Sequence, residues 1–271
     1  MGRRIYIYRS GATSDCALTG AKGDPRLPSP AAPDGWHFWM QIGPLQPEHR
    51  EYGFDVWAAV KGITTAFSAG RLHILRGDGD SGKTALFRFT GLLEAPAEGD
   101  VLIFGDPTRG LDEDKRTEVR TQRIGYAFSS PFLLRSFTVI ENVAMPLFKV
   151  SQVDPDEARR RTEAALEFVG LAHAIEAPVE DLSTLAQYGV AIARGLVNAP
   201  VALLVEDLDG VLAGPELEDF VDLLRRAAAT FGPAIVATAS PAIKIQPGDR
   251  VLDIAHGAIV RDSESLPETC E

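Results

Sequence analysis

Residues 77–84 constrain this chain more than any other stretch, because they have the spacing G-x-x-x-x-G-K-[ST] of a phosphate-binding loop. In such a loop, backbone N–H groups and a helix N-terminus surround the phosphates, Lys83 adds a point charge and Thr84 offers a hydroxyl to Mg²⁺. The flanking residues agree, since 72–75 is an apolar run typical of a buried strand and 85–93 is typical of a helix. The predicted nucleotide-binding residues are Gly77, Asp78, Gly79, Asp80, Ser81, Gly82, Lys83 and Thr84.

The composition is that of a globular protein that keeps to its compartment of synthesis. With 271 residues, 45% of them hydrophobic, the chain is long enough for one large α/β domain or two small ones. A formal net charge of −11 argues against a general nucleic-acid partner. The two cysteines, Cys16 and Cys270, have no metal-site spacing, and no run approaches the roughly 18 apolar residues that a membrane span needs. We therefore expect a reducing, cytoplasmic location.

The first part of the chain differs in composition from the rest. Residues 9–35 are rich in Gly, Ala, Ser, Asp and Pro, so that 1–35 is predicted to be a poorly ordered extension. Trp36, Phe38 and Trp39 end this region and favour a packed edge strand. The folded domain is therefore expected to occupy residues 36–271.

The remaining pattern alternates strands with helices. Continuous apolar runs typical of parallel strands follow the loop, and Asp154 with the proline after it is typical of a helix start. These predicted strands are 101–104, 124–128, 201–205, 234–238 and 251–254. The expected fold is α/β, a P-loop NTPase core with a parallel sheet, an inserted helical subdomain over about 115–188 and an antiparallel β edge.

Residues 57–261 resemble the nucleotide-binding subunit of ABC transporters, particularly the lipoprotein-release and macrolide-export branch. Four segments carry the resemblance. Residues 59–70 resemble the strand and turn before the family's phosphate loop. Residues 123–128 resemble the strand before the family's glutamine loop, and 141–147 resemble the segment near its membrane permease. Leu182 and Ser183, followed by 190–196, are similar to the beginning and continuation of the family signature.

The resemblance implies a set of cofactors and partners. The cofactors would be ATP and Mg²⁺. The partners would be an integral membrane permease and a second ATPase subunit, in a homodimer or in a heterodimer with another ABC subunit. The location would be cytoplasmic, peripheral on the inner face of the cell membrane.

Several positions depart from the family pattern where it handles the γ-phosphate. Ser129 occupies the position of the family's glutamine, and a serine side chain is shorter than a glutamine side chain. Glu206 followed by Asp207 inverts the family's aspartate and glutamate. The catalytic candidates are therefore Glu206 and, as a weak candidate for the base, Asp207. Glu206 is also a candidate Mg²⁺ ligand, with Thr84 and Ser129. Ala239 replaces the switch histidine and has no hydrogen-bond donor for the γ-phosphate.

The surfaces that should close over the nucleotide also differ. Residues 184–186 read Thr-Leu-Ala in place of Gly-Gly-Gln, so that Leu185 adds bulk where a backbone should approach phosphates. Ala213 replaces an aspartate, and Asp80 replaces a glycine of the loop. For the aromatic residue that stacks on adenine, Tyr52 is the candidate, although Phe54 and Trp57 compete and all three fit simple packing equally well.

Two functions within the resembled family remain open. One is an ATP-hydrolysing motor of an exporter or lipoprotein-release complex. The other, which the altered residues favour, is a nucleotide-binding subunit of a transport complex with weak or absent hydrolysis. A third alternative, a P-loop kinase, leaves the signature-like segment 182–196 unexplained.

Overall fold

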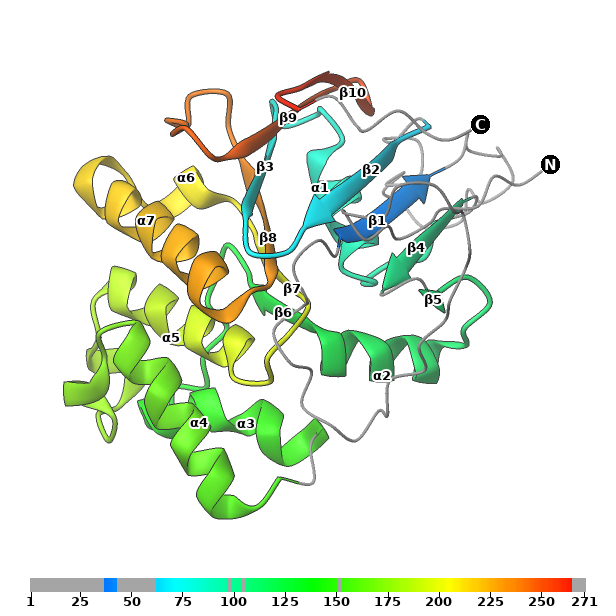
Figure 1. Ribbon diagram of the computed structural model, residues 1–271. Coiled ribbons are helices and arrows are strands. Elements are labelled where there is room, and N and C mark those ends of the chain that lie inside the picture. The colour runs from blue at the N-terminus through cyan, green and yellow to red at the C-terminus, as the bar shows by residue number, and fades with distance from the viewer. Residues whose placement is uncertain (1–36, 43–61, 97–98, 104–105, 151–152, 265–271) are drawn as a thin grey trace.

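The computed structural model describes residues 37–42, 62–96, 99–103, 106–150 and 153–264. These residues form two β-sheets and a set of helices (Figure 1). The expected extension 1–35 lies outside the described residues, and so do Tyr52, Phe54 and Trp57.

The larger sheet has six strands in the order β10-β9-β3-β8-β7-β6. Neighbours from β9 to β6 run parallel, and only β10 is antiparallel to its neighbour. This confirms the predicted P-loop α/β fold, with strand ends shifted by a residue or so. The bounds are β3 (Leu72–Arg76), β6 (Ile124–Ala127), β7 (Ala202–Val205), β8 (Ala234–Ala239), β9 (Arg250–Ala255) and β10 (Ala258–Asp262).

The smaller sheet has the order β2-β1-β4-β5, formed by β2 (Thr64–Ser68), β1 (His37–Ile42), β4 (Gly99–Ile103) and β5 (Asp106–Pro107). All of its pairings are antiparallel. The strand predicted after the N-terminal extension is present as β1, but the prediction that it lies at an edge is wrong. It pairs with β2 on one side and β4 on the other. Side-chain pattern reports which face is buried and not how many neighbours a strand has.

The helices follow the predicted alternation. α1 (Lys83–Thr90) begins two residues earlier than expected, so that its first turn includes the last two residues of the loop spacing. Asp154 accepts a hydrogen bond from the N–H of Asp156 as the N-cap of α4. The other bounds are α2 (Glu113–Arg123), α3 (Val139–Val150), α4 (Pro155–Phe168), α5 (Thr184–Leu196), α6 (Leu208–Val211), α7 (Gly214–Phe231) and the 3₁₀ turns η2 (Ala172–Ala174) and η3 (Val179–Asp181).

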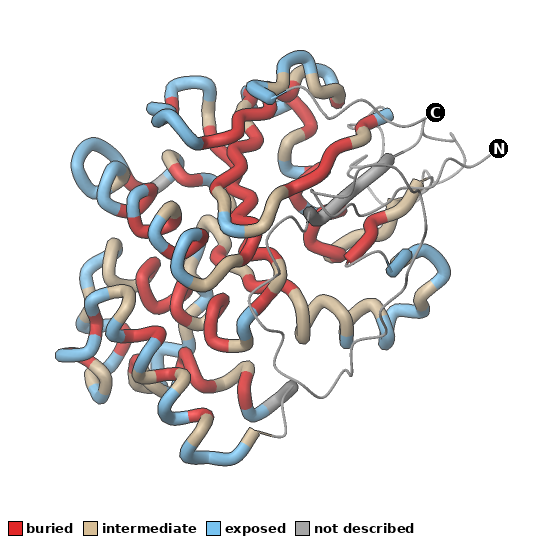
Figure 2. The backbone as a smooth tube through the Cα atoms, in the orientation of Figure 1, coloured by how far each residue is buried: buried red, intermediate tan, exposed pale blue. Residues whose placement is uncertain are grey.

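Apolar side chains pack on both faces of the larger sheet. On β8, Ile235 and Ala237 join the cluster shared with α5, α6 and α7, while Val236 points to the opposite cluster with α1 and β4. A third cluster joins α3, α4 and α5 away from the sheet. The buried strands run through the centre of the molecule in Figure 2. The carboxyl ends of β3, β7 and β8 therefore meet at one edge of the sheet, next to the predicted phosphate-binding loop.

Candidate functional site

The predicted loop connects the end of β3 to the start of α1, as its spacing requires. Gly82 adopts φ 94°, a left-handed conformation that glycine reaches without a Cβ clash. At Gly77, a Cβ would lie 2.5 Å from the carbonyl oxygen of Ile254, so this position has no room for a side chain. The two glycines thus let the backbone turn tightly between strand and helix.

The side chain of Lys83 forms hydrogen bonds with the backbone of the loop. Its Nζ donates to the carbonyl oxygens of Gly77 at 2.8 Å and Asp78 at 2.9 Å. Thr84 follows in the first turn of α1 and is exposed. The loop therefore presents an ammonium group, a hydroxyl group and a helix N-terminus together, which is the combination that binds phosphate.

The predicted loop residues differ in exposure. Asp78, Gly79 and Asp80 are exposed at its tip, whereas Ser81 and Gly82 are buried. Asp80 is not among the described residues with positive φ, so the loop accommodates it without left-handed strain. Its effect is electrostatic, since it places a negative charge in a loop whose geometry suits phosphate.

Two backbone contacts support the loop, and the sequence did not reveal either. The N–H of Gly257, in the turn between β9 and β10, donates to Ser81 O at 2.8 Å. The N–H of Gly77 donates to Ala239 O at 3.3 Å. Both partners lie more than 150 residues away in sequence, where local spacing carries no signal.

Ser129 and Glu206 lie against each other beside the loop. Ser129, just after β6, donates to Oε2 of Glu206 from its backbone N–H at 3.4 Å and from its hydroxyl at 3.2 Å. The short serine finds a partner because glutamate is one methylene longer than aspartate. Tyr188, on α5, donates from its hydroxyl to the carbonyl oxygen of Ser129. Burial raises the pKa of Tyr188, as does the charge of Asp207, so the phenol stays a donor.

The oxygens beside the loop suit Mg²⁺. Mg²⁺ is a hard cation that binds carboxylate and hydroxyl oxygens. Ser129 gives both of its hydrogen bonds to Oε2 of Glu206, so Oε1 is the carboxylate oxygen that would face the ion, with the hydroxyl of Ser129 beside it. Thr84 would add a third hard oxygen, leaving positions for phosphate and water.

Asp207, the weak candidate for the base, begins the short α6 in a left-handed conformation with φ 58°. Partial loss of solvation raises the pKa of its carboxyl, the charge of Asp209 raises it further, and Lys83 lowers it. The side chain is folded back, since a Cβ on Gly210 would lie 1.8 Å from its Oδ2. Asp207 is thus near the site, with its carboxylate turned along α6.

The end of β8 offers no side-chain donor at the expected switch position. Ala239 is fully buried. The next residue, Ser240, is engaged by Asp209, which accepts from its backbone N–H at 2.9 Å and also from its hydroxyl. This Asp209–Ser240 pair was missed from the sequence, because both residues only look like loop positions there.

The signature-like segment forms the start of α5. Ser183 is its N-cap and accepts from the N–H of Ala186 at 3.3 Å. Leu185 is half-buried and packs against the cluster of α5, α6 and α7. The bulk expected at the closing surface is therefore limited to the part of Leu185 that stays exposed.

Comparisons with known proteins agree with this geometry. The family model described as ABC transporter matches residues 60–207, more than half of the chain. The chain belongs to the ABC transporter ATPase family.

Relatives of this ABC ATPase match over most of their length. It is similar to the lipoprotein-releasing system ATP-binding protein LolD of Paramagnetospirillum magneticum, with 34% identity over 210 residues, 77% of this chain and 92% of that protein. LolD of Pseudomonas fluorescens is 30% identical over 210 residues, 78% of this chain and 92% of that protein. The dimeric structure of MJ0796, a bacterial ABC transporter cassette, superposes with a TM-score of 0.70 at 26% identity, covering 84% of this chain and 98% of that one.

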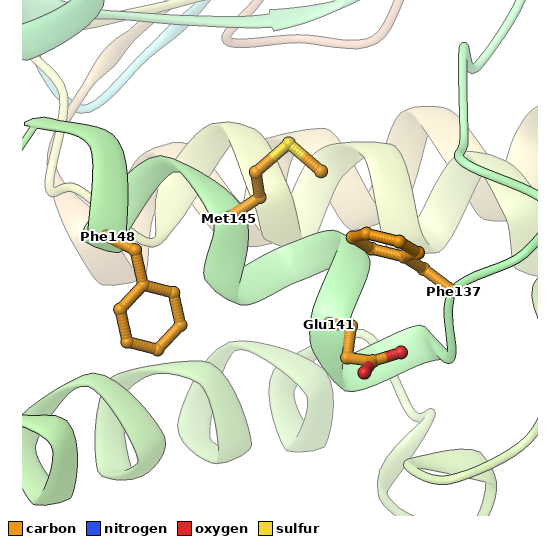
Figure 3. Close-up of a pocket in the computed structure, with 4 residues that line it drawn as sticks. All are labelled: Phe137, Glu141, Met145 and Phe148. Carbon is orange, nitrogen blue, oxygen red and sulfur yellow. The ribbon is translucent and has the colours of Figure 1, made fainter.

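A groove of about 350 Å³ opens on the helical side of this ABC ATPase (Figure 3). Phe137, Glu141, Met145 and Phe148 line it, and Phe148 is 67% exposed. Hydrogen bonds from the backbone N–H and hydroxyl of Thr138 hold the pKa of Glu141 below its usual value, so the groove carries a negative charge at neutral pH. No described helix is both long and apolar enough to cross a bilayer.

The loop after β6 presents a further apolar side chain on the helical side. Phe132 has φ 45° and is 67% exposed. Arg194, on α5, holds this loop by donating to the carbonyl oxygens of Pro131 at 2.8 Å and Phe132 at 2.9 Å. The two bonds thus hold the backbone at Phe132 while its ring stays exposed.

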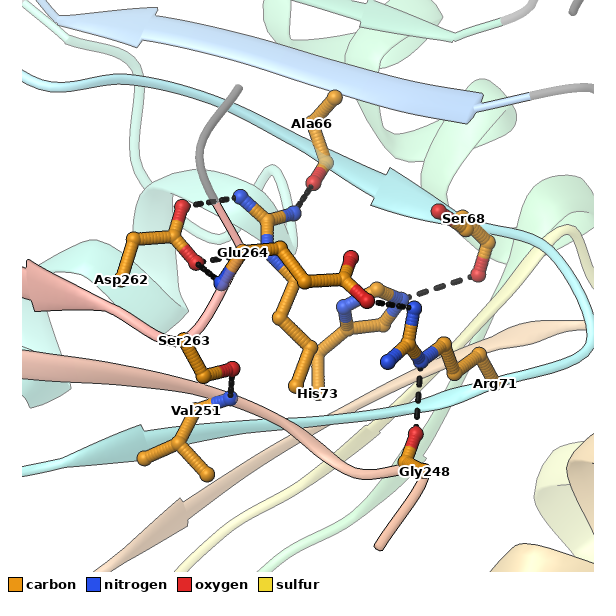
Figure 4. Close-up of polar contacts among 10 residues, drawn as sticks. Ala66, Ser68, Arg71, His73, Gly248, Val251, Asp262, Ser263 and Glu264 are labelled. Carbon is orange, nitrogen blue, oxygen red and sulfur yellow. Dashed lines mark hydrogen bonds and ion pairs between the residues drawn. The ribbon is translucent and has the colours of Figure 1, made fainter. Parts of the chain in front are cut away.

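A second polar cluster has a structural role (Figure 4). Arg250, 4% exposed, donates to Asp262 and to the carbonyl oxygen of Ala66. Arg71 donates to Gly248 O at 2.7 Å and pairs with Glu264. The bonds of Arg250 join β9 to β2 and β10, and those of Arg71 join the start of β3 to the residues flanking β9 and β10.

Proposed function

We propose that this chain is the nucleotide-binding subunit of an ABC-type membrane transport complex, binding Mg·ATP through residues 77–84 and hydrolysing it weakly or not at all. The observation that carries binding is Lys83, whose Nζ lies within hydrogen-bond distance of two loop carbonyls at the N-terminus of α1. A phosphate group entering the loop would meet this charge and the backbone donors together.

The residues proposed to hold Mg²⁺ are Thr84, Ser129 and Glu206. When bound, Mg²⁺ would neutralise part of the phosphate charge. Lys83 would bind the phosphates directly, and Ser129 would orient Glu206 through its two hydrogen bonds. Adenine stacking by Tyr52 remains a proposal from the sequence.

Weak hydrolysis follows from what the site offers to water and to the γ-phosphate. Activating water needs an oriented carboxylate, and the Asp207 side chain is short and turned along α6. The developing charge needs a donor, and the buried Ala239 has none. The nearby hydroxyl of Ser240 already donates to Asp209.

Binding and phosphate release of the purified protein test this proposal. We expect calorimetry to detect Mg·ATP binding that Lys83→Ala weakens strongly, with phosphate release far below the roughly 1 s⁻¹ of slower working enzymes. Release at about 1 s⁻¹ or faster, abolished by Lys83→Ala, would instead establish the alternative, an ATP-hydrolysing motor subunit.

The groove supports docking of an integral membrane permease. Its apolar side chains, with Phe132 and Leu134 exposed nearby, would accept the apolar face of a short helix, and Glu141 would pair with a basic residue on it. The subunit would then sit on the inner face of the cell membrane. Its second partner would be another ATPase subunit, identical or paralogous, since MJ0796 is dimeric.

Crosslinking from two exposed positions tests docking. A photocrosslinking residue at Phe148, in the groove, should capture a membrane-spanning protein in native membranes. The matched control is Val260 on β10, 62% exposed but away from the groove. Equal capture of the same protein from both positions, or of none from Phe148, would contradict the proposed surface.

A further inference from the structure

A chain of hydrogen bonds connects α5 to the candidate Mg²⁺ site. Tyr188 donates to the carbonyl oxygen of Ser129, and Ser129 donates through its N–H and hydroxyl to Glu206. The three residues come from α5, the loop after β6 and the position directly after β7, so the hydrogen bonds join three separate parts of the fold. Ser129 is held on its carbonyl side while its donors point to the carboxylate.

Tyr188 is fixed by packing as well as by its hydroxyl. It is 5% exposed, and its ring contacts Phe220 of α7 edge to face at 5.6 Å between centroids. A buried tyrosine with its ring in the core and its hydroxyl at a polar site has little freedom to move. Its hydroxyl is therefore a fixed point from which Ser129 is oriented.

Glu206 needs such support because of its neighbours. Asp207 and Asp209 follow within three residues, and like charges would drive a long glutamate side chain toward solvent. Both bonds from Ser129 reach the same oxygen, Oε2, so that Oε1 carries neither of them. The contact holds the carboxylate in place and leaves its other oxygen available.

We propose that Tyr188 is a positioning residue which, acting through Ser129, orients Glu206 and so determines how strongly nucleotide binding depends on Mg²⁺. This inference rests on the proposed binding of Mg·ATP at residues 77–84. The phosphates themselves would contact Lys83 and the loop, and not the hydrogen bonds among Tyr188, Ser129 and Glu206. Loss of the Tyr188 hydroxyl should therefore weaken binding with Mg²⁺ and leave binding without it unchanged.

Titration of a fluorescent ATP analogue with Mg²⁺ and with EDTA tests the inference. The quantity compared is the dissociation constant measured with EDTA divided by the one measured with Mg²⁺. Tyr188→Phe, which keeps the packed ring, should lower this ratio about tenfold, the lower end of the usual loss when a residue that supports a metal ligand is removed. Ser129→Ala should lower it at least as much, because it also removes a proposed Mg²⁺ ligand. The exposed neighbour variant Ser130→Ala should keep the wild-type ratio.

Two results would overturn the inference while the proposed function stands. One is a wild-type ratio in Tyr188→Phe, whatever the result for Ser129→Ala. The other is an equal loss of affinity with Mg²⁺ and with EDTA, which would indicate a general structural effect. Wild-type protein that binds no nucleotide in either buffer would contradict the proposed function itself, and the inference with it.

Discussion

The backbone N–H of Asp207 donates a hydrogen bond of 2.8 Å to the hydroxyl of Thr238. Thr238 lies on β8 and is 2% exposed, while Asp207 follows the neighbouring strand β7. The bond thus ties two parallel strands together where their carboxyl ends border the phosphate-binding loop. It also satisfies a backbone donor at a residue in a left-handed conformation.

Thr238→Val should therefore destabilise the fold. The variant keeps the shape of the side chain and leaves the Asp207 N–H without its acceptor, which costs about 1–3 kcal/mol of unfolding free energy. Urea denaturation measures the loss, and Thr238→Ser should recover most of it. A valine variant as stable as wild type would mean that the Asp207 donor readily finds water instead.

The ion pair between Arg76 and Asp253 predicts a pH-dependent stability. Arg76 donates two hydrogen bonds to this carboxylate, at 2.5 and 2.9 Å, and holds the pKa of Asp253 below its ordinary value of 3.8. A depressed carboxyl pKa stabilises the fold above the unfolded pKa and ceases to do so as pH falls through the folded one. Asp253→Asn should therefore lower the melting temperature at pH 7.

The difference between wild type and Asp253→Asn should shrink as pH falls below 3.8. Melting curves at several pH values measure it. Asp219→Asn, at an exposed position of α7, is the matched control and should change little at any of them. A difference that stays constant with pH would assign the effect to packing and not to charge.

The phosphate-binding loop could be predicted from sequence because its geometry depends on residues that are close to one another in the sequence. Gly77, Gly82 and Lys83 fix a turn within a few residues, and the apolar runs around them already define a strand and a helix. The Ser129–Glu206 bond joins residues 77 positions apart, so it depends on how β6 and β7 align. No local spacing contains that register.

The same limit explains the other differences. The burial of half of Leu185 depends on α7, which follows it in sequence, and the place of β1 between two strands depends on β4. Composition predicted that these residues pack. Which elements they pack against is decided only by the tertiary arrangement. The positions that depart from the family pattern were visible from sequence, whereas the bonds between Asp209 and Ser240, the residue after Ala239, were not.

Gly125 on β6 should tolerate no side chain. A Cβ there would lie 2.2 Å from the carbonyl oxygen of Gly195 on α5, a backbone atom that cannot move alone. Gly125→Ala should push α5 off the sheet and cost about 1–3 kcal/mol of unfolding free energy or more. The control is Gly79→Ala, where an added Cβ meets open space and φ is not positive. Equal stability of the two variants in urea would contradict this packing.

Asp80 should weaken nucleotide binding through its charge. It is exposed in the loop, close to where the phosphates would lie, so Asp80→Asn should raise affinity for Mg·ATP about two- to fivefold at low salt. Because salt screens exposed charges over about 10 Å at 0.1 M, the gain should shrink as ionic strength rises. Calorimetry at two salt concentrations measures both effects. Glu167→Gln, exposed on α4, changes the net charge equally but far from the loop. The same gain in that variant would assign the effect to overall charge, whereas a gain confined to Asp80→Asn would assign it to the loop.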